Sequence, residues 1–308
     1  MLNVVVAIPT FRRPQSLLRL LTAVENLRTR ATVTVVVADN DAEGREGFEI
    51  CRERAASGYG WPLDYFVAPE RGIANVRNAL VARSLSHACD FIAMLDDDEW
   101  PEPGWLEAFL RAQQATDADV LHGAVLREYE TAPGRWAARC DGIADMHGTT
   151  GPVSAIPGTG NIIFARRCFE GTLSQWFDPA FALCGGEDSD FLECLRRAGR
   201  RFAWCEEAVV HAWVPASRGN LRWALSRAYS TGNSDMRVFL KHGQSGAARA
   251  REAVKIAGAL LLSPLLFVIL GIGTNRAVDA LRKLFRAAGK LAAIRGRYYD
   301  EYSVTHGG

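Results

Sequence analysis

Four consecutive acidic residues, Asp96 to Glu99, directly follow the apolar run 91–95. The apolar run predicts a buried strand, and open α/β sheets form ligand sites at the carboxyl ends of their strands. Neighbouring carboxylates repel one another, so a chain keeps them together only beside positive charge or in contact with water. Hard oxygen ligands in this place indicate a Mg²⁺ or Mn²⁺ site in which substrate phosphates complete the coordination. The alternative is a solvated acidic turn before Pro101 and Pro103.

Strands and helices alternate through the first hundred residues. Apolar runs predict strands at 3–8, 33–38, 63–67 and 91–95, and helical patterns begin at Pro14 and near residue 73. This alternation predicts a parallel sheet with helices on both faces. Asp39 follows one strand as Asp96 follows another, so both acids are expected at the same rim of the sheet. Further elements are expected at 103–115, 119–126, 161–165, 189–198, 201–205, 208–213 and 219–241, with a long Gly-, Pro- and Thr-rich excursion at 130–160.

The bulk composition is that of an ordinary globular protein. The chain has 308 residues, of which 48% are apolar and 23% charged, and its net charge of +1 indicates no nucleic-acid partner. Seven cysteines include no Cys-x-x-Cys pair, which argues against structural zinc and dithiol chemistry. The chain starts directly with a strand rather than a basic and apolar leader. We therefore expect reduced thiols in a cytoplasmic setting.

The C-terminal tail has a different pattern. Residues 256–273 carry no charge, and the length of this run is close to that of a membrane span. Both of its flanks are basic. Since positive flanks prefer the cytoplasmic side and Pro264 could bend the segment back, a re-entrant or in-plane insertion is favoured over a full span. Residues 276–295 form a predicted basic amphipathic helix that suits an anionic membrane surface. The alternative is a buried helical hairpin.

These patterns divide the chain into a catalytic domain at 1–243 and a helical tail at 244–308. Contact with the membrane is expected through residues 249–297, which hold ten Lys or Arg and two acids. The expected location is the cytoplasmic face of the inner membrane, in a monotopic or single-span arrangement.

Two further patterns have both a plain and a catalytic interpretation. Glu187 and Asp188 follow two glycines and precede a predicted helix. Carboxylates in this position cap a helix and meet its dipole, or one of them serves as a general base. His211 follows a short apolar run, and it becomes a metal ligand only if the fold brings it to the rim that carries Asp98.

Five short segments occur in an order that resembles one enzyme family. They are Ala7–Pro14, Val37–Asn40, Arg71–Leu80, Leu95–Asp98 and Gly186–Asp188. Together they resemble the inverting nucleotide-sugar glycosyltransferases of family 2, in particular bacterial exopolysaccharide (succinoglycan-type) enzymes, over about residues 3–213. The resemblance implies the GT-A fold, an α/β fold with a mostly parallel, Rossmann-like central sheet flanked by helices.

The resemblance also implies a role for each matching residue. Asp98 would bind Mn²⁺ or Mg²⁺, with Asp96 facing the metal or the donor ribose and His211 as a further metal ligand. Asp188 would be the general base that activates the acceptor hydroxyl. The residues implied in binding the nucleotide sugar are Pro9, Thr10, Phe11, Arg13, Asp39, Arg77, Asp96, Asp97 and Glu187.

The leading hypothesis is thus a metal-dependent, inverting hexosyltransferase. It would move a sugar from a nucleotide sugar, expected to be a UDP-sugar, to a membrane-presented, polyprenyl-diphosphate-linked acceptor in exopolysaccharide or cell-surface glycan synthesis. A nucleotidyltransferase on a similar fold would need a Gly-rich signature after the first strand, and the segment 9–14 contains no glycine. A non-catalytic, membrane-docked scaffold is the other alternative, and the intact Asp98, Asp188 and His211 set argues against it.

Overall fold

A nine-stranded mixed sheet forms the centre of the protein. The computed structural model describes residues 1–171, 176–270 and 275–299. The strand order is β3-β2-β1-β4-β8-β6-β9-β5, and β7 pairs with β9 outside this path. The strands are β1 (Asn3–Thr10), β2 (Thr32–Asp39), β3 (Leu63–Val67), β4 (Phe91–Met94), β5 (Glu99–Pro101), β6 (Val120–Tyr129), β7 (Gly151–Val153), β8 (Ile162–Ala165) and β9 (Phe202–Val214).

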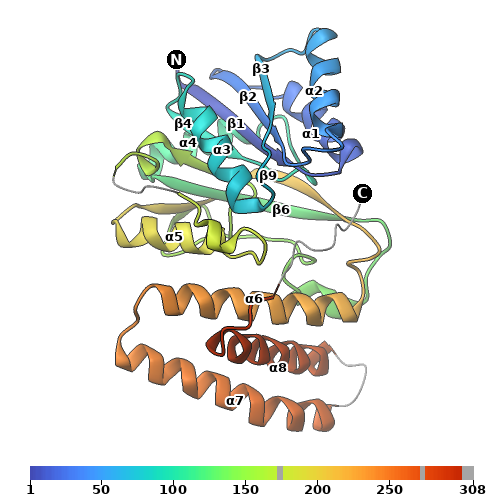
Figure 1. The fold of residues 1–308 in the computed structure, drawn as a ribbon, viewed down its shortest axis with the longest axis vertical. Helices are drawn as coiled ribbons and strands as arrows, with labels where there is room; N and C mark the ends of the chain where they lie inside the picture. The colour runs from blue at the N-terminus through green and yellow to red at the C-terminus, as the bar shows by residue number, and fades with distance from the viewer. Residues whose placement is uncertain (172–175, 271–274, 300–308) are drawn as a thin grey trace.

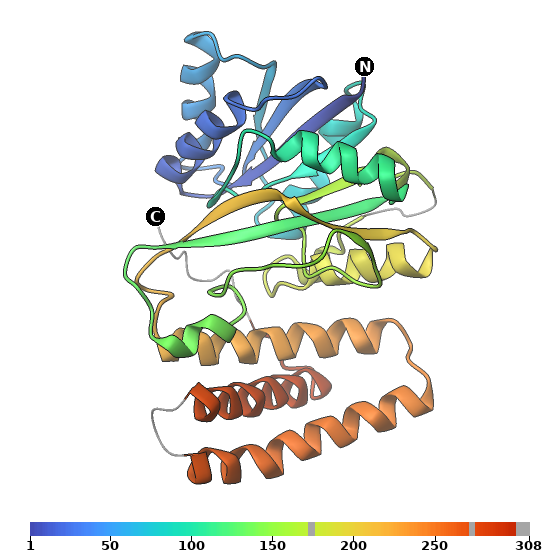
Figure 2. The same ribbon diagram turned by 180° about the vertical axis from the view of Figure 1, so that it is seen from behind.

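Two apolar cores cover the two faces of this sheet. On one face, Val4, Val6 and Ile8 of β1 pack with α1 (Pro14–Glu25), α2 (Glu46–Ala56) and α4 (Trp105–Thr116). On the other, Val5 and Ala7 pack with α3 (Ile73–Leu85) and α5 (Glu187–Arg197). Alternate side chains of one strand thus enter different cores, which is why these strands are apolar throughout. The figures show the sheet with helices on both sides (Figure 1, Figure 2).

The predicted α/β class is confirmed, with local differences. β3, β2, β1 and β4 are parallel as expected, whereas β8 runs antiparallel to β4 and β6. The helix α2 was not predicted, since its residues 46–56 have a weakly patterned sequence. The two strands expected at 201–205 and 208–213 are one strand, β9, whose pairing with β6 shifts register between Gly123 and Val125. A bulge of this kind continues a strand through a polar interruption.

Three helices form a separate layer at the end of the molecule opposite the N-terminus. They are α6 (Leu221–Lys241), α7 (Gly246–Leu270) and α8 (Asn275–Ile294), and α8 lies between the other two (Figure 1, Figure 2). The backbones of α6 and α8 touch where glycines meet. A Cβ on Gly289 would overlap the carbonyl oxygen of Tyr229, and one on Gly232 would overlap that of Arg286.

Three of the five basic residues of α8 pair with acids of other segments, while Arg276 and Lys283 are exposed, which differs in part from the membrane-surface helix expected for 276–295. Arg286 pairs with Asp235 at 2.6 Å, Lys290 pairs with Glu252, and Arg282 lies 3.5 Å from Asp141. The paired cations are less available to a lipid surface than expected. The alternative of a buried helical hairpin fits α8, which lies between α6 and α7 (Figure 1, Figure 2), but not α7, whose apolar window is only 11% buried. Membrane contact through 249–297 stays a prediction.

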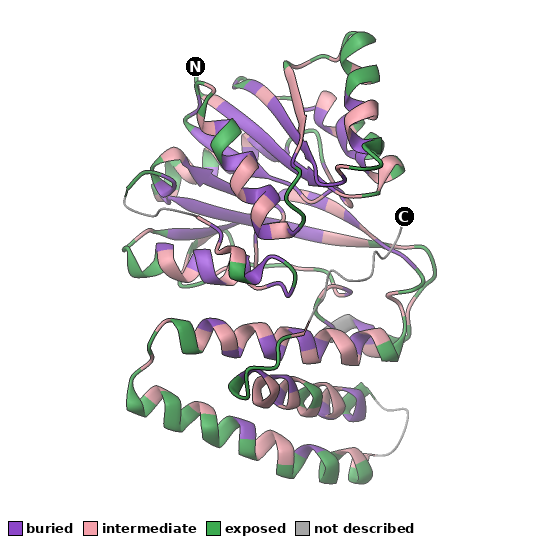
Figure 3. Cartoon of the chain, viewed as in Figure 1, coloured by how far each residue is buried: buried purple, intermediate pink, exposed green. Residues whose placement is uncertain are grey.

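The outer helix α7 keeps the apolar surface expected of the tail. Among the described residues it is the one helix long and apolar enough to cross a membrane, and 11% of its apolar window is buried. Its exposed side is predominantly apolar, with Val254, Leu261 and Val268 each more than 70% exposed (Figure 3). Pro264 lies inside this continuous helix, so the expected reversal at the proline is wrong. Residues 271–273 of the uncharged run lie outside the described residues.

The expected domain boundary at residue 243 falls in the short connection between α6 and α7. Because α6 itself packs against α8, the helical layer begins before that boundary, at Leu221. The division into 1–243 and 244–308 stays a prediction about folding units.

The glycine contact between α6 and α8 gives a prediction for stability. In Gly289→Ala the new methyl group forces the two helices apart, and such overpacking typically costs about 1–3 kcal/mol. Gly258→Ala is the matched control, since its Cβ meets nothing within 4 Å on the same helical layer. The control is expected to keep or raise the thermal midpoint by helix propensity. A rise with Gly289→Ala equal to that of the control would contradict the close packing.

Candidate active site

The predicted acids gather around the carboxyl ends of the parallel strands. Thr10 ends β1, Asp39 ends β2, and the acidic run 96–99 follows β4. These strands are neighbours in the sheet, so parallel pairing alone brings their ends together. The first turn of α5 adds Glu187 and Asp188 to this rim.

Asp97 ties the acidic run to the loop that follows β1. Its Oδ2 accepts hydrogen bonds from Thr10 Oγ1 at 3.0 Å and Phe11 N at 3.3 Å, and its Oδ1 accepts one from Arg13 Nη1 at 2.8 Å. Burial raises the pKa of Asp97 to about 6, against the lowering effect of Arg13. All of these contacts are within the protein, so Asp97 shapes the loop of Pro9, Thr10 and Phe11.

Asp98 lies between two arginines. Its Oδ2 accepts from Arg13 Nη1 at 3.1 Å and from Arg218 Nη1 at 3.2 Å. Burial would raise the pKa of Asp98, but the charges of Arg13 and Arg218 hold it below the usual value. This carboxylate is therefore held ionised, as a metal ligand must be. Sequence reasoning missed Arg218, which comes from the loop after β9 and has no motif around it.

Arg77 of α3 connects the two acidic motifs. Its Nη2 donates to Asp96 Oδ1 at 3.1 Å and its Nη1 donates to Glu187. Burial raises the pKa of Glu187 to about 8, although Arg77 favours the ionised form. The other oxygen of Glu187, Oε2, is buried and has no partner in the described part of the chain. A buried polar atom of this kind at a rim is suited to bind a polar ligand group.

A small loop, 158–160, lies against both Asp96 and Asp188. A Cβ added to Gly158 would lie 3.0 Å from Asp188 Oδ2, and one added to Gly160 would lie 3.2 Å from Asp96 Oδ2. The two carboxylates thus contact the same short backbone segment. Asp188 Oδ1 accepts the N–H of Ser189 at 2.6 Å. The sequence marked 130–160 only as a long Gly-rich excursion, so the importance of these two glycines was missed.

The acid Glu99 and the amide Asn161 form a buried support behind this loop. Glu99 Oε2 accepts the N–H groups of Asp96 and Asn161, both at 3.1 Å. Asn161 Nδ2 donates to the carbonyls of Ala124 and Ala208, at 2.7 and 2.9 Å. Burial raises the pKa of Glu99 to about 8. Asn161 has a positive φ of 45°, which brings its side chain into this network.

The residues expected at the nucleoside lie on the other side of the rim. Asp39 is buried, and its two oxygens accept the N–H groups of Asp41 at 2.9 Å and Phe48 at 3.0 Å. Phe11 is flanked by two guanidinium groups, those of Arg12 at 5.0 Å and Arg71 at 5.2 Å from the ring centre. Cations above an aromatic ring favour anionic or aromatic ligands at this position.

His211 lies elsewhere. It sits inside β9 opposite Trp100 of β5, and its ring stacks on that indole with centroids 5.7 Å apart. Its Nδ1 lies 3.0 Å from Glu128 Oε1 and its Nε2 lies 3.5 Å from Glu102 Oε1. Among the described residues, one group of possible metal ligands has its ligand atoms within 4.8 Å of one another. That group contains neither His211 nor Asp98. The imidazole pairs with Glu128 and Glu102 here, and its role as a metal ligand stays a prediction.

The remaining donor set fits a hard divalent cation. Asp96 and Asp98 offer carboxylate oxygens only, which are the ligands that Mg²⁺ and Mn²⁺ prefer. The Asp96 side chain is 40% exposed and can be reached from solvent. Arg13 and Arg218 already pair with Asp98, so a cation that binds this carboxylate would have to share it with them or displace them.

Comparison with known proteins identifies the family. The model of the family described as Glycosyl transferase family 2 matches residues 5–169. The succinoglycan biosynthesis protein ExoM of Rhizobium meliloti (strain 1021) is 32% identical over 271 residues, covering 84% of this chain and 81% of that protein.

Solved structures share the fold. The mannosyltransferase PcManGT from Pyrobaculum calidifontis, in complex with GDP-Man and Mn²⁺, matches with a TM-score of 0.61 at 18% identity over 96% of this chain and 87% of that chain. S. aureus TarS 1–349 in complex with UDP-GlcNAc matches with a TM-score of 0.52 at 12% identity over 97% and 93%. A longer S. aureus TarS chain matches with a TM-score of 0.53 at 15% identity over 96% of this chain. This chain spans 54% of the length of that TarS chain, about half. The sheet with its flanking helices is thus the GT-A fold. The chain belongs to glycosyl transferase family 2 and is a glycosyltransferase.

Proposed function

We propose that this protein is a metal-dependent, inverting enzyme that transfers a sugar from a nucleotide sugar, expected to be a UDP-sugar, to a lipid-linked acceptor at a membrane. The observation that carries the proposal is that Asp96 and Asp188 both lie against the loop 158–160, next to Gly160 and Gly158 respectively. This places a carboxylate suited to a metal near one suited to proton transfer. Related enzymes of exopolysaccharide synthesis support the substrate class, since ExoM is named for succinoglycan biosynthesis.

The metal site in this proposal consists of Asp98 and Asp96. A bound Mn²⁺ or Mg²⁺ supplies a Lewis acid for the negative charge that develops on the leaving diphosphate. Arg13 and Arg218 hold Asp98 ionised, and they lie close enough to share the diphosphate charge. The His211 role stays a proposal that requires the imidazole to leave Glu102 and Glu128.

The base in this proposal is Asp188. An acceptor hydroxyl is a poor nucleophile until its proton is removed as it attacks the anomeric carbon. One displacement by one base inverts the anomeric centre without a covalent intermediate. Glu187 Oε2 is buried and has no partner among the described residues. It is placed to form a hydrogen bond with a hydroxyl group of the sugar donor or of the acceptor substrate.

The donor pocket in this proposal extends from Pro9–Phe11 to Asp39. Two structural neighbours carry nucleotide sugars in their crystals, UDP-GlcNAc in one and GDP-Man in the other. We propose that Phe11, with the arginines above its ring, contacts the nucleoside, while Arg77 and Asp96 face its ribose and diphosphate.

The membrane part of the proposal rests on α7. Its exposed apolar face and its basic flank at 249–255 suit the cytoplasmic surface of an anionic bilayer. An acceptor held by a polyprenyl diphosphate would then be presented close to the enzyme. If the protein were a non-catalytic scaffold, it would not turn over the donor. If it were a nucleotidyltransferase, it would release pyrophosphate rather than a nucleoside diphosphate.

Replacing the base separates binding from transfer. Asp188→Asn is expected to lower the turnover number by ~10²–10⁴-fold while donor affinity stays unchanged, since a general base acts in the reaction step. Initial rates of nucleoside diphosphate release and titration calorimetry measure the two effects. Glu193→Gln, an acid on the outer side of the same helix, is the control and should keep its rate. Turnover near wild type for Asp188→Asn would rule out the assignment.

Replacing the metal ligand affects binding instead. Asp98→Ala is expected to abolish the gain in donor affinity that Mn²⁺ gives the wild-type enzyme, because Asp98 would hold the cation that neutralises the donor diphosphate. Calorimetry with Mn²⁺ and with a chelator measures the gain. A full gain in His211→Ala would show that the metal is held without the imidazole. An Asp98→Ala enzyme with full Mn²⁺ dependence would show that the metal lies elsewhere.

The apolar face of α7 predicts lipid binding. The double variant Leu261→Asp and Val268→Asp is expected to lose sedimentation with phosphatidylglycerol-containing vesicles, because charged groups resist transfer into the lipid interface. Leu18→Asp, on the exposed side of α1, is the control and should sediment as wild type does. Equal sedimentation of all three proteins would place the lipid contact on another surface.

A further inference from the structure

The first turn of α5 contains a buried carboxylate. Asp190 lies two residues after Asp188 and is 2% exposed. Its Oδ2 accepts a hydrogen bond from Lys241 Nζ at 2.6 Å, and its Oδ1 lies 2.9 Å from His242 Nε2. A buried charge is stable only when it is paired, so Asp190 depends on two residues from the C-terminal end of α6. α5 and α6 are thereby joined close to the proposed base.

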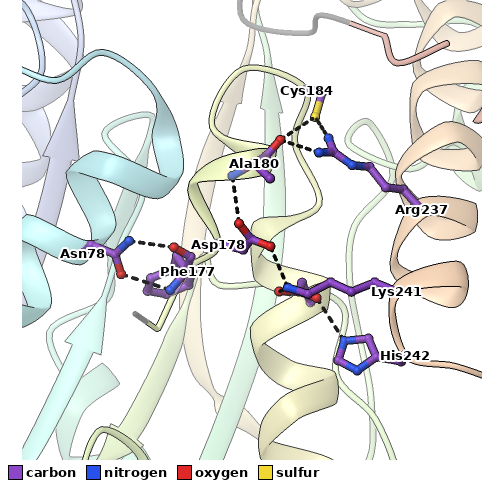
Figure 4. Close-up of polar contacts among 9 residues, drawn as sticks. Asn78, Phe177, Asp178, Ala180, Cys184, Arg237, Lys241 and His242 are labelled. Atoms are coloured by element: carbon purple, nitrogen blue, oxygen red, sulfur yellow. Dashed lines mark hydrogen bonds and ion pairs between the residues drawn. The ribbon is translucent and has the colours of Figure 1, made fainter. Parts of the chain in front are cut away.

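Lys241 makes a second ion pair with the segment that precedes α5. Its Nζ lies 2.7 Å from Asp178 Oδ2, and Asp178 Oδ1 in turn accepts the N–H of Ala180 at 2.8 Å. One ammonium group therefore joins the start of this segment to the first turn of the helix that follows it. Figure 4 shows Asp178, Lys241 and His242 around this point.

The same face of α6 holds the middle of the segment. Arg237 Nη2 donates to the carbonyl of Ala180 at 2.6 Å (Figure 4). Its guanidinium lies 4.2 Å from the ring centre of Phe181. One turn earlier, Ser234 Oγ donates to the carbonyl of Cys184 at 3.3 Å. Positions 234, 237 and 241 share one side of a helix by their spacing. The contacts thus extend along the whole segment 178–190.

The start of the segment is also fixed by α3. Asn78 Nδ2 donates to the carbonyl of Phe177 at 2.6 Å, and Phe177 N donates to Asn78 Oδ1 at 3.0 Å (Figure 4). Between the fixed parts, Gly185 and Gly186 have φ values of 72° and 95°. Glycines in this region offer little conformational resistance of their own. The contacts of the segment with α3 and α6 must therefore determine where Asp188 lies.

The cluster has the ligand types of a metal site, but its charge is already balanced. Ligand atoms of Asp190, Cys194 and His242 lie within 4.8 Å of one another. The Lys241 ammonium, however, is bonded to Asp190 and supplies the positive charge that an ion would bring. Burial also raises the pKa of the Cys194 thiol, which disfavours the thiolate that binds metals.

We infer that Lys241 is a positioning residue for the proposed base Asp188, acting through Asp190 and Asp178. This inference rests on the proposed function of Asp188. Because α6 also packs against α8, the group that holds the base belongs to the same helical layer as the apolar surface of α7. Displacement of a catalytic group by about an ångström can cost ~10²-fold in rate, so loss of this anchor should appear in turnover.

The direct test compares three variants at a temperature well below their melting transitions. Lys241→Met is expected to lower the turnover number by about 10–100-fold with the donor KM unchanged, because no donor-binding residue contacts Lys241 in the described structure. Lys241→Arg should restore most of the rate. Arg52→Met, which removes an exposed cation of α2 far from the proposed sites, is the control. An unchanged turnover number for folded Lys241→Met would overturn the inference.

A double-mutant cycle shows whether Lys241 acts through Asp188. If it does, the effect of Lys241→Met falls below about 2-fold in the Asp188→Asn background. An effect of full size in that background would overturn the inference while leaving the base assignment intact, and an active Asp188→Asn enzyme would instead overturn the proposed function. Cys194→Ser should keep its turnover, and a loss equal to that of Lys241→Met would indicate a metal in place of the ion pairs.

Discussion

The pairing of buried carboxylates with arginines at one rim of the sheet is the interaction on which the site depends. Asp97 and Asp98 share Arg13, while Asp96 and Glu187 share Arg77. Without these cations the acids would repel one another and take up protons, because each is partly or fully removed from water. Arg13 lies in the loop before α1 and Arg77 lies in α3. Their ion pairs therefore join segments that lie about 85 residues apart (Arg13 and Asp98) and 110 residues apart (Arg77 and Glu187) in the sequence.

The sequence predicted the strand ends well but not the connections between them. Apolar runs located β1, β2 and β4, and the parallel pairing of their ends placed Asp39 and Asp96 at one rim. Gly158 and Gly160 come to this rim because β8, which follows them, runs antiparallel to β4. A short apolar run does not show whether its strand will be parallel or antiparallel to its neighbour. His211 shows the same limit: a residue after three apolar positions can end a strand or lie in its middle, and here β9 continues to Val214.

The tail shows how charge patterns mislead when partners are unknown. Taken alone, the cations of 276–295 suit anionic lipid. In the structure the acids Asp235 and Glu252 lie opposite them on α6 and α7. The apolar face of α7 has no such counterpart in the described part of the chain, and the proposed lipid contact therefore rests on α7. Two sides of α6 make different contacts. One side packs on α8 through Gly232, and another contacts the segment before α5.

The most direct test of the account is the thermal midpoint of the whole protein with nucleotide sugars, each measured with Mn²⁺ and with a chelator. A ligand that binds only the folded state raises the midpoint by mass action. The account predicts a rise with at least one UDP-sugar that requires Mn²⁺. No rise with any UDP-, GDP- or dTDP-sugar, or a rise of equal size in the chelator, would contradict a rim of carboxylates that binds a donor through a divalent cation.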